Sequence, residues 1–61
     1  MTLREWLFYN RKMIKDMAKD LEINPLYLGQ IKNGRHKPSV KMAKQIERYT
    51  GGEVSYLDLI I

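Results

Sequence analysis

The sequence predicts a small all-α fold, a bundle of four to five short helices with a short C-terminal tail. Side chains that cap helix N-termini recur ahead of amphipathic stretches, at Thr2, Asn24 and Ser39. Glycines follow these stretches, at Gly34 and Gly51-Gly52, where a helix C-terminus favours a residue that adopts positive φ without a Cβ penalty. A chain of 61 residues has room for one hydrophobic core, so we expect residues 1–61 to form a single domain.

The first helix is expected over residues 3–9. Thr2 and Glu5 have the spacing of a capping box, in which the threonine hydroxyl accepts from the Glu5 amide and the Glu5 carboxylate accepts from the Thr2 amide. Trp6 shares an apolar helical face with Leu7. Trp6 is therefore interpreted as a core side chain rather than as a platform for a ligand.

Residues 14–33 predict two short helices that meet at a tight turn. Met17 and Ala18 lie on the apolar face of the first helix, and the Ala18 methyl lets the second helix cross it closely and steeply. The second helix begins at Pro25, because Asn24 can cap it and proline needs no amide partner in a first turn. The flexible side chains expected to fill the gap between the helices are those of Met13 and Met17. This arrangement is a helix-turn-helix.

The second helix of the pair, residues 25–33, has two different faces. Leu28 and Ile31 form the seam that packs on the preceding helix. The opposite face carries Leu26, Tyr27, Gln30 and Asn33. In a DNA major groove glutamine can bond adenine, tyrosine can reach a base edge or phosphate, and leucine can touch a thymine methyl. We therefore expect Leu26, Tyr27 and Gln30 to contact bases. In the alternative interpretation Leu26 and Tyr27 only cover part of a small core.

Positive charge gathers after this helix. The net charge is +4, and residues 32–48 carry six cations (Lys32, Arg35, Lys37, Lys41, Lys44 and Arg48) against one acid, Glu47. A run of charge is often only a solvated surface, but this run flanks the turn motif. The polar and basic side chains expected to contact DNA phosphates are Asn33, Arg35, Lys37, Ser39 and Lys41.

The remaining sequence predicts one more helix and a tail. Pro38 disfavours helix before it and Ser39 is a good N-cap, so a helix should run from Val40 to about Tyr49. Its expected core stripe consists of Val40, Met42, Ala43, Ile46 and Tyr49.

The tail can form either a short helix from Ser55 or a strand. Leu57 and Leu59 are expected to close the core, and the expected dimer interface consists of Leu59, Ile60 and Ile61. The alternative is a frayed end.

These residues carry a family resemblance. The run from Met17 to Ser39 resembles the helix-turn-helix of phage Cro and lambda-repressor-type regulators, on Met17-Ala18, Ile23-Asn24, Leu28, Ile31, Gly34 and Pro38-Ser39. It is more closely similar to small Cro-like prophage regulators of the YdaS type, on YLGQIKNG (27–34) and IERYTGGEVSYLDL (46–59).

Two positions depart from the family pattern. Glu22 replaces a turn glycine, which costs about 1 kcal/mol if the residue is left-handed. Ile14 replaces a polar residue that commonly bonds a phosphate.

The resemblance implies a lambda-repressor-like bundle and a sequence-specific regulator of transcription that binds double-stranded DNA. It also implies a Cro-like repressor, a homodimer on an inverted repeat, and a phage or prophage origin. A different function on the same fold stays open, namely an antitoxin or protein-interaction module whose tail binds a toxin or another protein.

Other classes of function are disfavoured. The chain has no cysteine and one histidine, so disulfides and a metal site lack ligands, and no cofactor is expected. No set of catalytic residues can be assembled, so we expect no enzyme, and His36 is better explained as a phosphate or solvent contact. RNA binding is less favoured, because no exposed aromatic sheet is predicted. No apolar run is long enough for a membrane and no signal peptide is evident, so we expect a cytoplasmic, nucleoid-associated protein of a bacterial or phage-infected cell.

Overall fold

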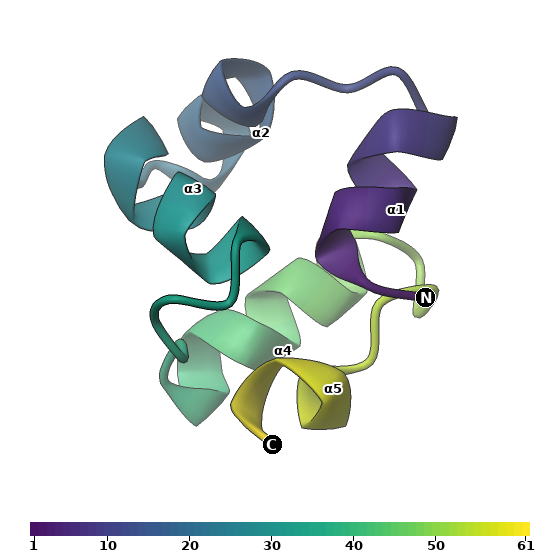
Figure 1. Cartoon of the computed structure of the whole chain (residues 1–61), viewed down its shortest axis with the longest axis vertical. Helices are drawn as coiled ribbons and strands as arrows, with labels where there is room; N and C mark the ends of the chain where they lie inside the picture. The colour runs from purple at the N-terminus through teal and green to yellow at the C-terminus, as the bar shows by residue number, and fades with distance from the viewer.

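The structure, a computed structural model that describes residues 1–61, contains five α helices and no β strand. In chain order the helices are α1 (Leu3–Tyr9), α2 (Ile14–Leu21), α3 (Pro25–Lys32), α4 (Val40–Tyr49) and α5 (Tyr56–Ile60). Figure 1 shows α1 and α3 on opposite sides of the molecule, with α4 running between them. The predicted lambda-repressor-like all-α bundle is confirmed. The tail takes the helical alternative.

The helix starts follow the predicted capping side chains. The capping box of α1 is complete, with the Thr2 amide 2.9 Å from the Glu5 carboxylate and the Glu5 amide 3.2 Å from the Thr2 hydroxyl. The Asn24 side chain accepts from the Leu26 amide at 2.8 Å, with Pro25 in the first turn of α3. Ser39 caps α4 in the same way. These local bonds explain why the helices begin where the sequence predicts.

The core lies where the helices converge. Met17, Ala18, Leu28, Ile46 and Val54 are completely buried. They form one cluster with Leu3, Trp6, Leu7 and Ile31. Trp6 is 8% exposed, which confirms it as a core residue.

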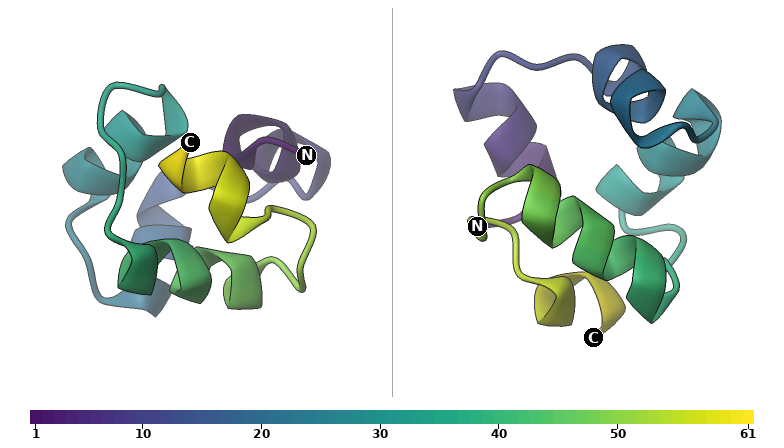
Figure 2. Two further views of the ribbon diagram at one scale, coloured as in Figure 1. Left: turned by 90° about the horizontal axis from the view of Figure 1, so that it is seen from below. Right: turned by 180° about the vertical axis from the view of Figure 1, so that it is seen from behind.

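Two pairs of helices pack closely, α2 on α3 and α4 on α5. Both views in Figure 2 keep α5 beside α4. The link between α4 and α5 is held by the buried Thr50, whose hydroxyl donates to the Glu47 carbonyl and accepts from the Val54 amide, each at 3.1 Å. The Trp6 indole N–H donates to the Glu53 carboxylate at 2.9 Å, which joins α1 to the same link.

Three predicted core contributions are wrong. Val40 is 49% exposed, because it is the first residue of α4 and lies at the edge of the bundle. Met13 is 58% exposed at the N-cap of α2, whereas Met17 is completely buried. Leu57 is 47% exposed whereas Leu59 packs on the core. Helical residues two apart do not face the same way, so α5 can place only one of these two leucines inside.

Candidate nucleic-acid interface

The turn between α2 and α3 is held by backbone bonds and one left-handed residue. Glu22 has φ 58° and ψ 42°, so the non-glycine residue takes the conformation that the family pattern gives to glycine. Its amide donates to the Lys19 carbonyl at 3.1 Å, and the Ile23 amide donates to the Ala18 carbonyl at 2.9 Å. These bonds satisfy the last carbonyls of α2 and let the chain reverse into α3. The cost expected for a left-handed glutamate, about 1 kcal/mol, therefore applies.

The inner sides of α2 and α3 meet without solvent between them. Ala18 and Leu28 are both 0% exposed, and Ile31 is 6% exposed. An alanine at position 18 leaves room for α3 to pack close to α2, as the sequence predicts. Because both helices are short, this contact fixes which side of α3 faces away from the bundle.

The outward side of α3 is exposed to different degrees along its length. Leu26 is 72% exposed, and Gln30 and Asn33 are also exposed. Tyr27 is only partly exposed, because its ring packs against the core and meets the His36 ring edge-to-face at 5.1 Å between centroids. The expectation that Tyr27 lies on the outward side of α3 therefore holds only for part of its ring, and the core-covering alternative describes the other part. Leu26 covers no core.

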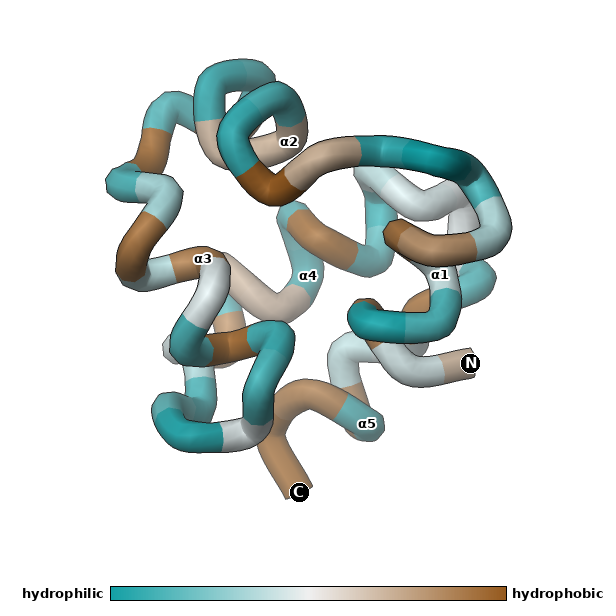
Figure 3. The backbone as a smooth tube through the Cα atoms, turned by 45° about the horizontal axis from the view of Figure 1, so that its top comes forward, coloured by the Kyte–Doolittle hydropathy of each residue, from teal (hydrophilic) through white to brown (hydrophobic).

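The loop after α3 is fixed at both ends. Gly34 has φ 75°, and the carbonyl of Gln30 accepts from the Arg35 amide at 2.9 Å and from the His36 amide at 3.3 Å. Pro38, further along, is buried. Figure 3 shows this loop as a hydrophilic stretch on the surface. The loop therefore holds its basic side chains on a defined backbone.

The predicted phosphate contacts all reach solvent, and they lie along one continuous path. Asn33 is the C-cap of α3, Arg35 and Lys37 lie on the loop, and Lys41 lies in the first turn of α4. Ser39 is exposed, while its hydroxyl oxygen accepts from the Met42 amide at 3.2 Å to cap α4. In Figure 1, α3, the loop and the start of α4 follow one another along one side of the molecule.

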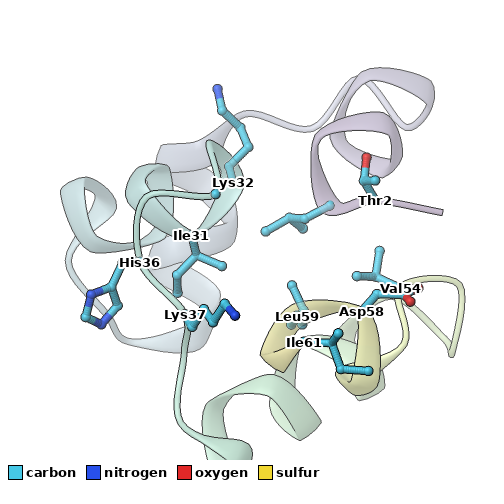
Figure 4. Close-up of a pocket in the computed structure, with 11 residues that line it drawn as sticks. Thr2, Ile31, Lys32, His36, Lys37, Val54, Asp58, Leu59 and Ile61 are labelled. Carbon is cyan, nitrogen blue, oxygen red and sulfur yellow. The ribbon is translucent and has the colours of Figure 1, made fainter.

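The predicted dimer residues lie closer to this path than the sequence indicates. Leu59 packs on the core, Ile60 is partly exposed and Ile61 is 81% exposed. A cleft of about 270 Å³ separates this tail from the end of α3, with Leu59 and Ile61 on one wall and Lys32 and Lys37 on the other (Figure 4). Sequence reasoning missed this proximity, because it joins segments that are distant in the chain. It also missed the contact of Tyr27 with His36, because that contact depends on how the loop folds back after α3.

The comparisons identify the family. Residues 10–57, more than three quarters of the chain, match the family model described as Helix-turn-helix, of the Cro and C1 type. The chain therefore belongs to this helix-turn-helix family. It is a DNA-binding regulator of transcription, and the family is not one of enzymes. Searches of curated proteins and of solved structures gave no match. Separately, no helix here combines the length and the apolar character needed to cross a bilayer.

Proposed function

We propose that this regulator recognises a specific DNA sequence by inserting α3 into the major groove and acts as a Cro-like repressor. One observation carries the proposal, namely the contrast between the two sides of α3. Leu28 is completely buried, whereas Leu26, two residues earlier, is 72% exposed beside the polar Gln30. A large apolar side chain held in water next to an amide suits a surface made of thymine methyls and base edges.

Each proposed base contact has a different chemistry. Gln30 offers an amide that can make two hydrogen bonds to adenine, and Leu26 offers an apolar contact to a thymine methyl. Tyr27 contributes the exposed part of its ring and its hydroxyl, while the packing against His36 restricts its rotation. Restricting a reading side chain before binding reduces the entropy lost on the DNA.

The proposed phosphate contacts come from the path after α3. Asn33, Arg35, Lys37, Ser39 and Lys41 are all exposed along it. Contacts to phosphates fix the register of a protein on the duplex without reading its sequence. A dimer that neutralises about four phosphates per subunit should show log K falling against log salt with a slope of about −7.

A homodimer would use the tail. Ile61 is 81% exposed and Ile60 partly so, and Ile61 lines the same cleft as Lys37 of the loop after α3. Leu59 contributes less than Ile61 to this interface, because it already packs on its own core. Two-fold contact here would hold two α3 helices about 34 Å apart and select an inverted repeat.

Selection of bound fragments from a random duplex pool, followed by binding measurements on variants, tests the proposal. We expect an inverted repeat with half-sites one helical turn apart. Gln30→Ala should reduce discrimination at one base pair by about 1 to 3 kcal/mol. Lys37→Ala should weaken cognate and random duplexes equally and make the salt slope shallower. Equal losses on both duplexes for Gln30→Ala would contradict the assignment of that residue, and an affinity independent of salt would contradict the phosphate contacts.

A second candidate function is that of an antitoxin or protein-interaction module. The exposure of Leu57 on α5 and of Ile61 just after it favours this function, because both side chains could be covered by another protein. Titration of a toxin-like partner would then protect the amides of α5 from hydrogen exchange, whereas a repressor dimer would protect them without a partner. The proposed setting in either case is the cytoplasm of a bacterial or phage-infected cell, and the prophage relationship stays part of the proposal.

A further inference from the structure

Three large side chains lie exposed together at the end of α1 and the start of α2. Phe8 is 78% exposed, Tyr9 69% and Met13 58%. The Phe8 and Tyr9 rings meet edge-to-face with 5.7 Å between centroids. All three line one shallow depression together with Leu7 and Arg11. We call Phe8, Tyr9 and Met13 the aromatic corner.

The aromatic side chains of the corner are far more exposed than their neighbours in α1. Trp6 and Leu7, one or two residues earlier, are 8% and 6% exposed, so α1 does have a buried side. Burying a side chain the size of phenylalanine is worth about 1.5 to 3 kcal/mol, and that stabilisation is not realised here. Clustered aromatic side chains that the fold leaves in water are the kind that dominate protein interfaces.

The aromatic corner stays accessible when α3 is in use. Figure 1 and both views in Figure 2 place α1 and α3 on opposite sides of the molecule. The residues proposed to contact DNA lie on α3, on the loop after it and at the start of α4. A ligand on Phe8 and Tyr9 therefore leaves α3 and the loop after it uncovered. Of the corner, only Met13 lies at the start of α2, next to Ile14, where the family pattern has a phosphate contact.

The charges around the corner indicate what would bind there. Arg4 lies one helical turn before Phe8, and Arg11 lines the depression, with its amide donating to the Phe8 carbonyl at 3.2 Å. Neither arginine forms an ion pair. Lys12 is paired with Asp20 at 3.5 Å. Glu5, one turn before Tyr9, and Asp16, one turn after Met13, are acids close by in the chain, but neither lines the depression. Arg11 is the only charged residue that lines it, so the charge within the depression is positive.

This charge pattern disfavours a second copy of the chain. Two-fold contact of aromatic corners would bring the arginines of both subunits together, and like charges across an interface cost several kcal/mol. A carboxylate partner instead gives each guanidinium a bidentate acceptor. A membrane surface is also less suited, because the amphipathic helices that lie on membranes are usually much longer than the seven residues of α1.

We propose that the aromatic corner docks an acidic segment of another protein while α3 remains free to hold DNA. One aromatic or large aliphatic side chain of that segment packs on Phe8, Tyr9 and Met13, and neighbouring carboxylates pair with Arg4 and Arg11. The regulator would then have two separate surfaces, one for the duplex and one for a protein recruited to it.

A random peptide library displayed on phage and panned on the full chain tests this. We expect enrichment of peptides that combine an aromatic or aliphatic anchor with acidic neighbours. Replacing Phe8 and Tyr9 together by serine should weaken these peptides at least tenfold, with the helix content and melting temperature little changed because both side chains are exposed. The matched control is Leu26→Ser, which removes an equally exposed side chain from α3 and should leave peptide affinity unchanged.

Further experiments test the role of the arginines and distinguish an acidic peptide from the other possible ligands of the aromatic corner. Arg4→Gln and Arg11→Gln should each weaken the peptides several-fold, and the duplex should bind the peptide complex with unchanged affinity. Failure to enrich any acidic peptide, or enriched peptides that ignore the Phe8 and Tyr9 double variant, would overturn the proposal. So would a dimer in sedimentation that the double variant dissociates, or binding to phosphatidylserine vesicles that it abolishes, since these identify a second copy or a membrane as the occupant. If DNA binding itself fails, the peptide arms still decide this question.

Discussion

The α2–α3 pair and α5 are both short helical elements, but they are held in the molecule in different ways. The pair contributes three completely buried side chains, Met17, Ala18 and Leu28. No residue of α5 is buried. It is fixed instead by the buried Val54 before it, by its Ser55 cap, and by the Glu47 carboxylate, which accepts from the Tyr56 amide at 3.0 Å.

The difference separates two roles. In α2–α3 the inward contacts determine the direction of α3, so the outward side chains can serve recognition without being needed for the fold. In α5 the hydrogen bonds to the amides at its start add to the partial packing of Leu59 on the core, and Leu57 stays in water. A helix held in this way can pack on a partner protein without exposing completely buried core side chains.

The largest expected effect compares two leucines of α3. Leu28→Ala should lower the free energy of unfolding by about 2 to 5 kcal/mol, because it leaves a cavity at a completely buried position. Leu26→Ala should change it by less than about 0.5 kcal/mol, because the side chain is 72% exposed, while DNA binding weakens. Urea denaturation and duplex binding measure the two quantities. Similar losses of stability in both variants would contradict the division between the two sides of α3.

A smaller effect is expected in α5. Leu59→Ala should cost about 1 to 2 kcal/mol, since this side chain packs on the core but remains partly exposed. Leu57→Ala, two residues earlier and 47% exposed, should cost less than about 0.5 kcal/mol. Thermal unfolding at low protein concentration isolates the monomer. A larger loss for Leu57 than for Leu59 would show that α5 presents its other side to the core.

A substitution in the turn between α2 and α3 is expected to stabilise the protein, whereas the preceding ones destabilise it. Glu22→Gly should raise the free energy of unfolding by about 0.5 to 1 kcal/mol, because glycine takes φ 58° without a Cβ clash. Part of the gain is offset by the extra freedom of glycine in the unfolded chain. Urea denaturation measures the change, and Lys19→Gly, in the helical part of α2, is the matched control and should destabilise. A loss of stability in Glu22→Gly would mean that the glutamate side chain makes a compensating contribution.

The smallest effect concerns a pH-dependent contact between α2 and α4. The Tyr49 hydroxyl donates to the Asp20 carboxylate at 2.6 Å, and Lys12 lies 3.5 Å from the same group. The hydrogen bond from Tyr49, with help from Lys12, lowers the pKa of Asp20 below its usual 3.8. Burial, followed by the bond to Asp20, raises the pKa of Tyr49 above its usual 10.0.

These shifts have opposite consequences at the two ends of the pH scale. The contribution of Asp20 is complete above pH 3.8 and is lost as the pH falls through its lower folded-state pKa. The contribution of Tyr49 is complete below pH 10.0 and is lost as the pH rises through its higher folded-state pKa. Asp20→Asn should therefore flatten the acid side of a melting profile taken from about pH 5 to about pH 2.

The controls for this profile are two tyrosine variants. Tyr49→Phe keeps the ring that meets Trp6 edge-to-face at 5.8 Å but removes the donor, so it should flatten the profile as Asp20→Asn does. Tyr56→Phe removes a hydroxyl that does not contact Asp20 and should leave the profile unchanged. An unaltered profile in both Asp20→Asn and Tyr49→Phe would show that the contact does not persist in solution.

The sequence by itself determined the starts of α1, α3 and α4 and how α2 meets α3, whereas it left the tail open between a helix and a strand. Those features depend on residues a few positions apart, such as Thr2 with Glu5, Asn24 with Pro25, and Gly34 just past α3. Capping bonds and the φ preferences of proline and glycine act over this short range, so they can be read before the fold is known.

Only the tertiary structure decided which apolar side chains stay outside. Apolar patterning assigned Val40, Met13 and Leu57 to the core, yet all three are exposed, and it left Tyr27 outside although its ring is partly covered. Burial depends on what the neighbouring helices cover, and five short helices cannot enclose every apolar position of 61 residues. The nearness of the tail to the end of α3, and of Tyr49 to Asp20, likewise arises from packing between distant segments.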